Sequence, residues 1–362
     1  MIYSIIGTKG QLIKMAPVMK EIEKRGLEHK FIHGGQHGEI MGKLIEVFGI
    51  REPDYYLQKR DQDVLTAFGG VRWFTSTMMN GIFNGNKIFK DKDSIVLVHG
   101  DAPPCLTGTL IAKMNGLKVG HVEAGLRTYD FLNPFPEEFV RVTTDKLADY
   151  MFAPSDFAEN NLKKMSVKGE IINTKYNTVF ETIELSVKMK RKINYPKEKY
   201  VVFTTHRFET IHSLKLMKKN LDVLEKVSKI HYVVMIMHNT TKEKLVRFNL
   251  MDRITEMDNV EIRSLQVYPD FMKLINKSEF VVTDGGGLQE ETYYLNKPCL
   301  VLRKKTERSE GLNGNVVISK MKEDLIEDFL ENYSSYSRKR KLKIKSCPSN
   351  KIVNFIEKEV LE

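Results

Sequence analysis

Short apolar runs alternate with amphipathic stretches along this chain, and that alternation limits the possible folds more than any other feature. Residues 2–6, 94–99 and 117–122 have the length and composition of buried strands. Helix-period stretches follow each of them. Alternating strands and helices predict a parallel, doubly wound sheet covered by helices on both faces.

The same alternation starts again near residue 201, after a lysine-rich stretch at 188–199. A chain of 362 residues is also long enough for two domains. We therefore predict an N-terminal Rossmann-like domain over residues 1–172 and a C-terminal one over residues 173–345. A final helix within residues 346–362 is expected to pack back on the first domain.

Polar residues collect where the predicted strands end, in both halves of the chain. Asp101 follows the strand at 94–99, and Glu123 follows the strand at 117–122. In the second half, His206-Arg207 and Asp284 follow strands in the same way. Open α/β sheets bind ligands at the carboxyl ends of their strands, so these positions are the candidate site.

The stretch from His121 to Arg141 carries the densest set of charges. Glu137 and Glu138 would lie in the first turn of a helix beginning at Pro136, where the helix dipole favours acidic residues. Arg141 is spaced to meet Glu137 on one helix face. For Glu138 a structural role in the helix cap is the simpler reading, whereas the position of Glu123 in a loop after a buried strand favours function.

Glycine-bearing turns suggest contacts with phosphate. The turn Asp284-Gly285-Gly286-Gly287 would let backbone N–H groups approach phosphate oxygens, although a triple glycine can also be only a tight turn. His206-Arg207 and Glu307-Arg308 strengthen the phosphate interpretation. The turn at residues 7–11, with Lys9 and Lys14, is a weaker anion-binding candidate. We expect an anionic, nucleotide-linked ligand held by the second half, facing carboxylates in the first half that can move protons.

Composition excludes several other classes of protein. Lys and Arg outnumber Asp and Glu by 57 to 47, and much of the excess lies in residues 338–345, which has the composition of a solvated connector. The basic and aromatic interleaving of single-strand nucleic-acid binders is missing. The three cysteines have no metal-ligand spacing, and no segment has the length of a membrane span or the pattern of a signal peptide. A cytoplasmic protein without a metal is expected.

The motifs together resemble one family, the non-hydrolysing UDP-N-acetylglucosamine 2-epimerases. The likeness runs in order from residue 5 to about residue 315. It rests on Gly7-Thr8, Lys14-Met15-Ala16-Pro17, Gly35-Gln36-His37, Gly100-Asp101, the stretch 121–141, Phe152-Ala153-Pro154, His206-Arg207, Asp284 to Glu291, and Arg303 to Gly311.

The resemblance implies a two-domain fold of the GT-B type with the active site in the interdomain cleft, a homodimer, and no cofactor. It implies reversible interconversion of UDP-GlcNAc and UDP-ManNAc, for cell-surface polysaccharide precursors. In that mechanism UDP is eliminated across C1–C2 to give 2-acetamidoglucal and is then added back with C2 inverted. Hydrolysing relatives lack the Pro-Glu-Glu segment that this chain has at 136–138.

The resemblance also implies roles for individual residues. Asp101, Glu123 and Glu137 would be acids and bases, and His206 would stabilise the diphosphate. The UDP and sugar contacts would be Lys9, Lys14, Arg141, Arg207, Gln266, Phe271, Gly285, Gly286, Gly287, Glu291 and Arg308. Glu291 would hold the ribose, and Gln266 and Phe271 the uracil. Gln36 and His37 match a loop that helps to bind a second, allosteric UDP-GlcNAc; Gln62 is a weaker candidate for the same site.

Two departures from the family pattern concern phosphate contacts. The usual Gly-Thr-Arg-Pro-Glu is Gly7-Thr8-Lys9-Gly10-Gln11, and a lysine cannot reproduce the forked contact of an arginine. The usual Asp-Ser-Gly-Gly has Gly285 in place of serine. These changes leave open a modified UDP-2-acetamido sugar as the substrate. A GT-B glycosyltransferase or a non-catalytic nucleotide-sugar binding protein are the remaining alternatives.

Overall fold

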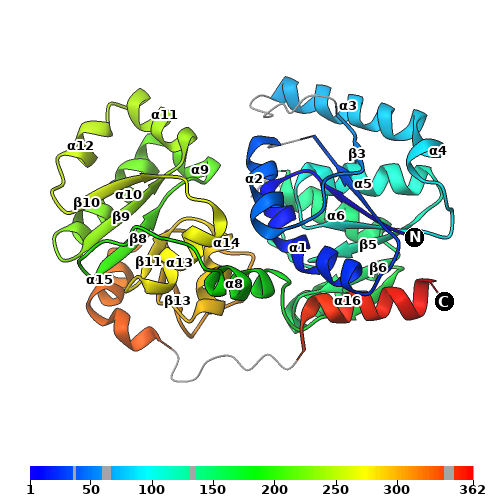
Figure 1. Ribbon diagram of the computed structural model, residues 1–362. Coiled ribbons are helices and arrows are strands. Elements are labelled where there is room, and N and C mark those ends of the chain that lie inside the picture. The colour runs from blue at the N-terminus through cyan, green and yellow to red at the C-terminus, as the bar shows by residue number, and fades with distance from the viewer. Residues whose placement is uncertain (36–37, 59–66, 131–135, 338–345, 362) are drawn as a thin grey trace. The chain divides into compact units, whose positions relative to one another are not determined.

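The computed structural model describes residues 1–35, 38–58, 67–130, 136–337 and 346–361 (Figure 1). The chain forms two compact units. One contains Met1–Thr182 and Ile344–Glu362, and the other contains Ile183–Lys343. The predicted boundary lay at residues 172 and 173, so the units begin and end at somewhat different residues from the predicted domains.

The first unit is built on a parallel sheet of seven strands in the order β3-β2-β1-β4-β5-β6-β7. Its central strands are entirely buried, as expected for a sheet covered on both faces. The strands are β1 Ile2–Ile6, β2 His29–His33, β3 Tyr55–Tyr56, β4 Ile95–His99, β5 Lys118–Val122, β6 Tyr150–Ala153 and β7 Glu170–Asn173.

Helices cover both faces of this sheet (Figure 1). They are α1 Lys9–Lys24, α2 Gly38–Phe48, α3 Ala67–Phe83, α4 Gly85–Ile88, α5 Pro103–Met114, α6 Glu137–Leu147, α7 Asp156–Met165 and α8 Val179–Lys188, which runs on into the second unit. Aliphatic side chains of the strands pack with residues such as Cys105 and Ile111 of α5 in a continuous buried core.

The C-terminal helix packs on the first unit. In Figure 1, α16 (Pro348–Ile356) lies beside α1 and β6. Arg25, just after α1, donates hydrogen bonds to Asn354 at 2.6 Å and to Glu357 at 2.8 Å. A short π-helical turn, η2 Glu357–Leu361, ends the described chain.

The second unit has a six-stranded parallel sheet in the order β10-β9-β8-β11-β12-β13. Its strands are β8 Tyr200–Thr204, β9 Tyr232–Met237, β10 Val260–Ser264, β11 Val281–Thr283, β12 Cys299–Val301 and β13 Val316–Ile318. Its helices are α9 Phe208–Ile211, α10 Leu214–Ser228, α11 Asn239–Arg247, α12 Met251–Thr255, α13 Tyr268–Lys277, α14 Gly286–Leu295, α15 Glu323–Asn332 and the 3-10 turn η1 Tyr333–Tyr336. Both sheets reverse their strand order beside the first strand, as doubly wound folds do.

Two doubly wound α/β sheets are what the alternation of strands and helices predicted. Helix α3 continues through Gly69 and Gly70 without a break. Packing outweighs their low helix propensity, since Trp73 is buried in this helix and its indole N–H donates to the Gly34 carbonyl at 3.1 Å.

Three short edge strands, β3, β7 and β13, were not expected from the sequence. They have two to four residues each, too few for a periodic pattern to show. Helix α1 begins at Lys9, because Thr8 caps it. The Thr8 side chain accepts from the Gln11 N–H, and the Gln11 side chain reaches back to the Thr8 N–H.

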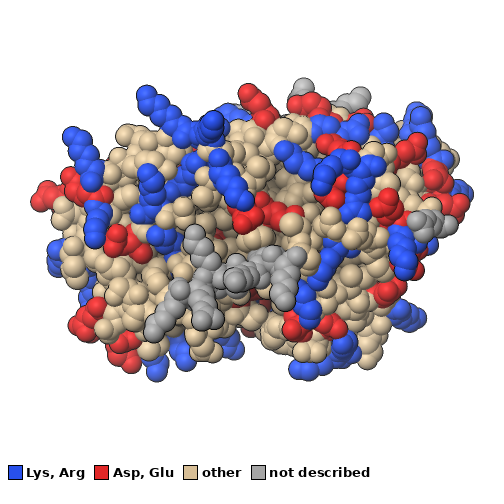
Figure 2. Space-filling view, turned by 60° about the horizontal axis from the view of Figure 1, so that its bottom comes forward, with Lys and Arg blue, Asp and Glu red and all other residues tan. Residues whose placement is uncertain are grey.

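Basic and acidic side chains lie interspersed on the face drawn in Figure 2. Among the described residues coloured in that view, Lys and Arg do not gather into one continuous basic surface of the kind that nucleic-acid binding uses. Among the described residues, no helix is long and apolar enough to cross a membrane.

Candidate active site

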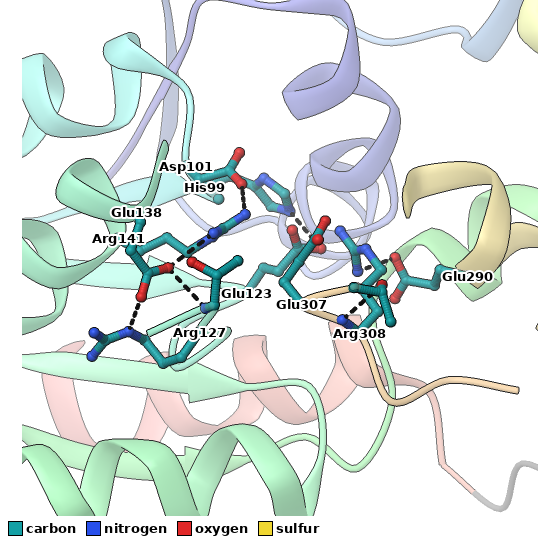
Figure 3. Close-up of polar contacts among 12 residues, drawn as sticks. His99, Asp101, Glu123, Arg127, Glu138, Arg141, Glu290, Glu307 and Arg308 are labelled. Carbon is teal, nitrogen blue, oxygen red and sulfur yellow. Dashed lines mark hydrogen bonds and ion pairs between the residues drawn. The ribbon is translucent and has the colours of Figure 1, made fainter. Parts of the chain in front are cut away.

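Asp101 lies just beyond β4 in a sharp turn. Gly100 before it has a φ of 68°, a left-handed conformation that glycine adopts without strain. The Asp101 carboxylate forms an ion pair with the Arg141 guanidinium, which comes from α6 (Figure 3). The Asp101 side chain keeps 31% of its surface exposed, whereas Arg141 is buried. The carboxylate of Asp101 is therefore open to a ligand while its partner is fixed.

Glu123 follows β5 and is held by donors from two other segments. Its backbone is left-handed, with a φ of 67°, and its side chain is 4% exposed. Lys14 of α1 forms an ion pair with the carboxylate, and the Asn177 side-chain amide donates to it. A cation and an N–H donor that both contact the carboxylate favour its ionised form, which is the form that can accept a proton.

His99, the last residue of β4, lies next to the Glu123 side chain. Its Nε2 is 4.0 Å from a Glu123 carboxylate oxygen. Burial lowers the pKa of His99 to about 3, even though the carboxylate acts in the opposite direction, so this ring is neutral at physiological pH. His99 therefore adds no positive charge beside Glu123.

Glu138 is the centre of a buried network in the first unit (Figure 3). Its carboxylate accepts from Arg127 Nε at 2.7 Å and from Arg141 at 3.1 Å. It also accepts from the backbone N–H groups of Thr128 and Tyr129, both at 3.0 Å. Burial opposes ionisation, but these bonds outweigh it and hold the pKa of Glu138 below its usual value. Glu138 thus fixes Arg141, which in turn holds Asp101.

Glu137 is the first residue of α6, and Pro136 is the N-cap rather than a residue of the first turn. The side chain of Glu137 is partly exposed, while that of Glu138 points into the protein. The first turn of α6 therefore buries Glu138 completely and leaves Glu137 partly exposed, with one carboxylate oxygen of Glu137 buried. Residues 131–135 of the motif lie outside the described part of the chain.

In the second unit, Asp284 holds the loop that carries His206 and Arg207. It lies just after β11, fully buried. It accepts from Thr205 Oγ1 at 2.8 Å and from the backbone N–H groups of His206 at 3.0 Å and Arg207 at 3.2 Å. Asp284 thereby fixes the backbone at His206, the residue predicted to stabilise the diphosphate.

The His206 ring packs between the glycine turn and a second histidine. It stacks on His238, with ring centroids 4.5 Å apart and planes at 12°. A Cβ at Gly285 would lie 2.8 Å from His206 Cε1, closer than real contacts allow. A serine side chain at position 285 would therefore collide with the His206 ring as it lies in this protein, whereas glycine leaves room for the ring. A Cβ at Gly287 would meet nothing within 4 Å, so the start of α14 has open space beside it.

Two buried ion pairs stand near the start of α14. Arg308 bonds Glu290 at 2.5 Å, and Arg303 bonds Glu307 at 3.0 Å (Figure 3). A Cβ at Gly286 would lie 2.6 Å from Glu307 Oε1. Arg308, whose guanidinium is predicted to contact phosphate, thus uses one of its nitrogens in the ion pair with Glu290.

The remaining predicted residues are more dispersed. Glu291 accepts from the Tyr268 hydroxyl at 3.0 Å, and Gln266 donates to the Ser264 carbonyl at 2.8 Å. Phe271 is half-buried on α13, and Lys9 is half-buried in the first turn of α1. Gln36, His37 and Gln62 lie outside the described residues.

Several contacts were not foreseen from the sequence. Lys14 was expected to contact the anionic ligand, and its pairing with the Glu123 carboxylate was not foreseen. Asn177 and His99 were not predicted, and no local pattern marks them, because they reach Glu123 only through the fold. No group of three His, Cys, Asp or Glu side chains suitable for a metal occurs among the residues that the structure describes.

Comparison with known proteins gives the family. The family model for UDP-N-acetylglucosamine 2-epimerase matches residues 20–353. The chain belongs to the UDP-N-acetylglucosamine 2-epimerase family. It is 32% identical to the UDP-N-acetylglucosamine 2-epimerase of Methanococcus maripaludis over 337 residues, which cover 89% of this chain and 88% of that one. The predicted family is confirmed, and its members are isomerases.

Solved structures of the family agree. The UDP-GlcNAc 2-epimerase of Neisseria meningitidis bound to UDP-GlcNAc has a TM-score of 0.84 and 28% identity, covering 99% of this chain and 100% of that one. The Methanocaldococcus jannaschii UDP-GlcNAc 2-epimerase, in complex with UDP-GlcNAc and UDP, has a TM-score of 0.83 and 26% identity, covering 99% of both chains. The predicted fold class is thereby confirmed.

Proposed function

We propose that this protein catalyses the reversible epimerisation of UDP-GlcNAc at C2, giving UDP-ManNAc. Membership of the family and the likeness to structures with bound UDP-GlcNAc support this reaction. The observation that carries it is Glu123, an almost fully buried carboxylate between the Lys14 ammonium and the Asn177 amide. A base that removes a carbon-bound proton must be ionised and fixed in place, and these two partners provide both conditions.

The proposed mechanism is elimination followed by re-addition. Glu123 takes the C2 proton, the C2–H electron pair forms the C1–C2 double bond, and the C1–O bond breaks with its electrons on the diphosphate oxygen. The products are 2-acetamidoglucal and UDP. UDP then adds back to C1 while C2 receives a proton on the opposite face. Asp101 and Glu137 are the candidate acids for that return step, because both residues are partly exposed, in contrast to Glu123.

The second unit supplies the groups that bind UDP in this proposal. The N-terminus of α14, a helix of ten residues, is favourable for a diphosphate because of its dipole and its glycines. His206 and Arg207, held by Asp284, would neutralise the charge that develops on the leaving group. Gln266 and Phe271 would hold the uracil, and Glu291 the ribose. We infer that the second unit holds the UDP part of the substrate, as the family resemblance implies.

Deuterium exchange tests the reaction directly. Incubation with UDP-GlcNAc in D2O should place deuterium at C2 of both epimers. Glu123→Gln keeps the shape of the side chain but not its basicity, so turnover should fall below detection while UDP still binds. Glu159→Gln, at a partly exposed glutamate paired with Lys163, is the matched control and should keep full activity. Near wild-type activity in Glu123→Gln would contradict the assignment of the base.

Further features follow from the family resemblance and belong to the same proposal. We expect a cytoplasmic homodimer that serves cell-surface polysaccharide synthesis, with a second, regulatory UDP-GlcNAc bound near Gln36 and His37. Light scattering tests the dimer. Initial rates with UDP-ManNAc as substrate test the regulation, since traces of UDP-GlcNAc should then accelerate the reaction. The Lys9 and Gly285 departures make a panel of UDP-2-acetamido sugars the appropriate test of substrate range.

A further inference from the structure

A buried histidine lies between the end of β4 and helix α6 in the first unit. His121 is the fourth residue of β5 and is completely buried. Its Nδ1 is 2.7 Å from a carboxylate oxygen of Asp145 on α6, and its Nε2 is 2.9 Å from the backbone carbonyl oxygen of Gly100. The ring therefore joins two other elements of the fold.

Both oxygens that face this ring are hydrogen-bond acceptors without a proton to give. Each ring nitrogen must carry a hydrogen if both contacts are to be hydrogen bonds, and a neutral imidazole has only one. Burial opposes a charged ring, but interactions with Cys105 and with the Asp145 carboxylate raise the pKa of His121 well above its usual value. His121 and Asp145 are thus a buried ion pair.

The pair connects the three segments that carry the predicted carboxylates. Gly100, held by Nε2, immediately precedes Asp101. The second Asp145 oxygen accepts from the Gly125 N–H at 3.3 Å, two residues after Glu123. Asp145 itself lies on α6, the helix that begins with Glu137. Both turns also need left-handed backbones, at Gly100 and at Glu123, so strand geometry alone does not fix them.

We propose that His121 and Asp145 are positioning residues that set the placement of Asp101 and Glu123 relative to each other for proton transfer at C2. This role rests on the proposed epimerase function. Displacing a catalytic carboxylate by about 1 Å can lower a rate by about 100-fold. The His121–Asp145 pair, which holds the turns next to Asp101 and Glu123, should therefore affect the rate of catalysis. The pair touches no predicted UDP group, so its loss should affect kcat and leave UDP affinity unchanged.

The variant Asp145→Asn removes the negative charge of the side chain and keeps its size and shape. The asparagine carbonyl can still accept from Nδ1–H, but the ring then loses its charge and its second proton. Nε2 would turn a lone pair toward the Gly100 carbonyl, and the hold on the turn before Asp101 would be lost. The other ionisable groups near the ring are Cys105 and His99, and the variant leaves both in place.

A matched control is available at the opposite end of the same strand. Asp149 accepts from the Val119 N–H at 2.7 Å and pairs with Lys113 at 2.6 Å, at the start of β5. Asp149→Asn removes the same charge and also loosens a backbone contact of β5. Because this end of the sheet is far along the strand from Glu123, the control should lower thermal stability without a selective loss of kcat.

The experiment measures kcat and KM for C2 deuterium incorporation, UDP affinity by calorimetry, and melting temperature for wild type and both variants. We expect kcat to fall by about 30- to 100-fold in Asp145→Asn, with KM and UDP affinity within about twofold. A kcat within about twofold of wild type, or an equal fall in Asp149→Asn, would overturn the positioning role. If wild type itself incorporates no deuterium, the proposed function fails instead.

Nuclear magnetic resonance of the wild-type protein labelled with ¹⁵N-histidine provides a test that needs no variant. One buried histidine should show both ring nitrogens protonated at pH values well above the ordinary histidine pKa. If every buried histidine is neutral there, His121 cannot donate to both oxygens and the proposal is wrong.

Discussion

The Glu138 network predicts a large and specific loss of stability in Glu138→Gln. The carboxylate accepts four hydrogen bonds, two from buried arginines and two from backbone N–H groups, and it is completely buried. Glutamine has one carbonyl oxygen, so two of the four donors would face its NH2 group. Arg127 and Arg141 would also lose their shared negative charge.

Removing one partner of a buried ion pair costs about 3–5 kcal/mol. Glutamine keeps part of the hydrogen bonding, so we expect the lower end of that range, about 3 kcal/mol. With a urea dependence of about 2 kcal/mol per molar, the unfolding midpoint of the first unit should fall by about 1.5 M. Arg141 would no longer be fixed beside Asp101, so activity should fall as well.

The assay can be confined to the first unit. The chain has one tryptophan, Trp73, which is buried in α3, so its fluorescence reports unfolding of that unit. Far-UV circular dichroism follows both units together. Glu159→Gln removes a pair with Lys163 at the surface, whose glutamate is partly exposed, and should shift the midpoint by less than about 0.5 M, because surface pairs contribute about 0–1 kcal/mol.

Acid should remove the same stabilisation in wild type. The folded pKa of Glu138 lies below its usual value, so the stabilisation is present above the unfolded pKa and is lost as the pH falls through the folded one. Glu138→Gln should lack this acid-sensitive part. A midpoint shift in Glu138→Gln no larger than that of Glu159→Gln would refute the account of the network.

Three further predictions follow from single contacts. His29 is buried with a pKa lowered to about 4, so stability should decline as the pH falls from about 6.5 to 4, and His29→Gln should flatten that decline in urea titrations at several pH values. Ile352→Ala empties a fully buried site in α16 and should destabilise the first unit by about 2–4 kcal/mol, measured by Trp73 fluorescence. Gly285→Ala places a methyl group 2.8 Å from His206 Cε1, so UDP affinity, measured by calorimetry, should fall by up to about tenfold.

The local pattern of the sequence was sufficient for the fold class. Strand and helix periodicities depend on residues a few positions apart, so the alternation from residue 2 to residue 302 could be read directly. Position at a strand's carboxyl end marked Asp101, Glu123 and His206 as site candidates for the same reason. Short edge strands such as β7 were missed because their stability comes from a neighbouring strand and not from their own residues.

Only the tertiary structure decided which partner each charged group has. Lys14 reaches Glu123 across 109 residues of sequence, and Arg141 joins Asp101 across 40. The sequence favoured Glu138 as a simple part of the helix cap, yet its burial between two arginines makes it the residue that fixes Arg141. His121 and Asp145 carry no motif that marks them as a pair. Ion pairs of this kind depend on distances of a few ångströms between segments that only the folded chain brings together, because the Coulomb energy and the desolvation that oppose each other both depend on that distance and on burial.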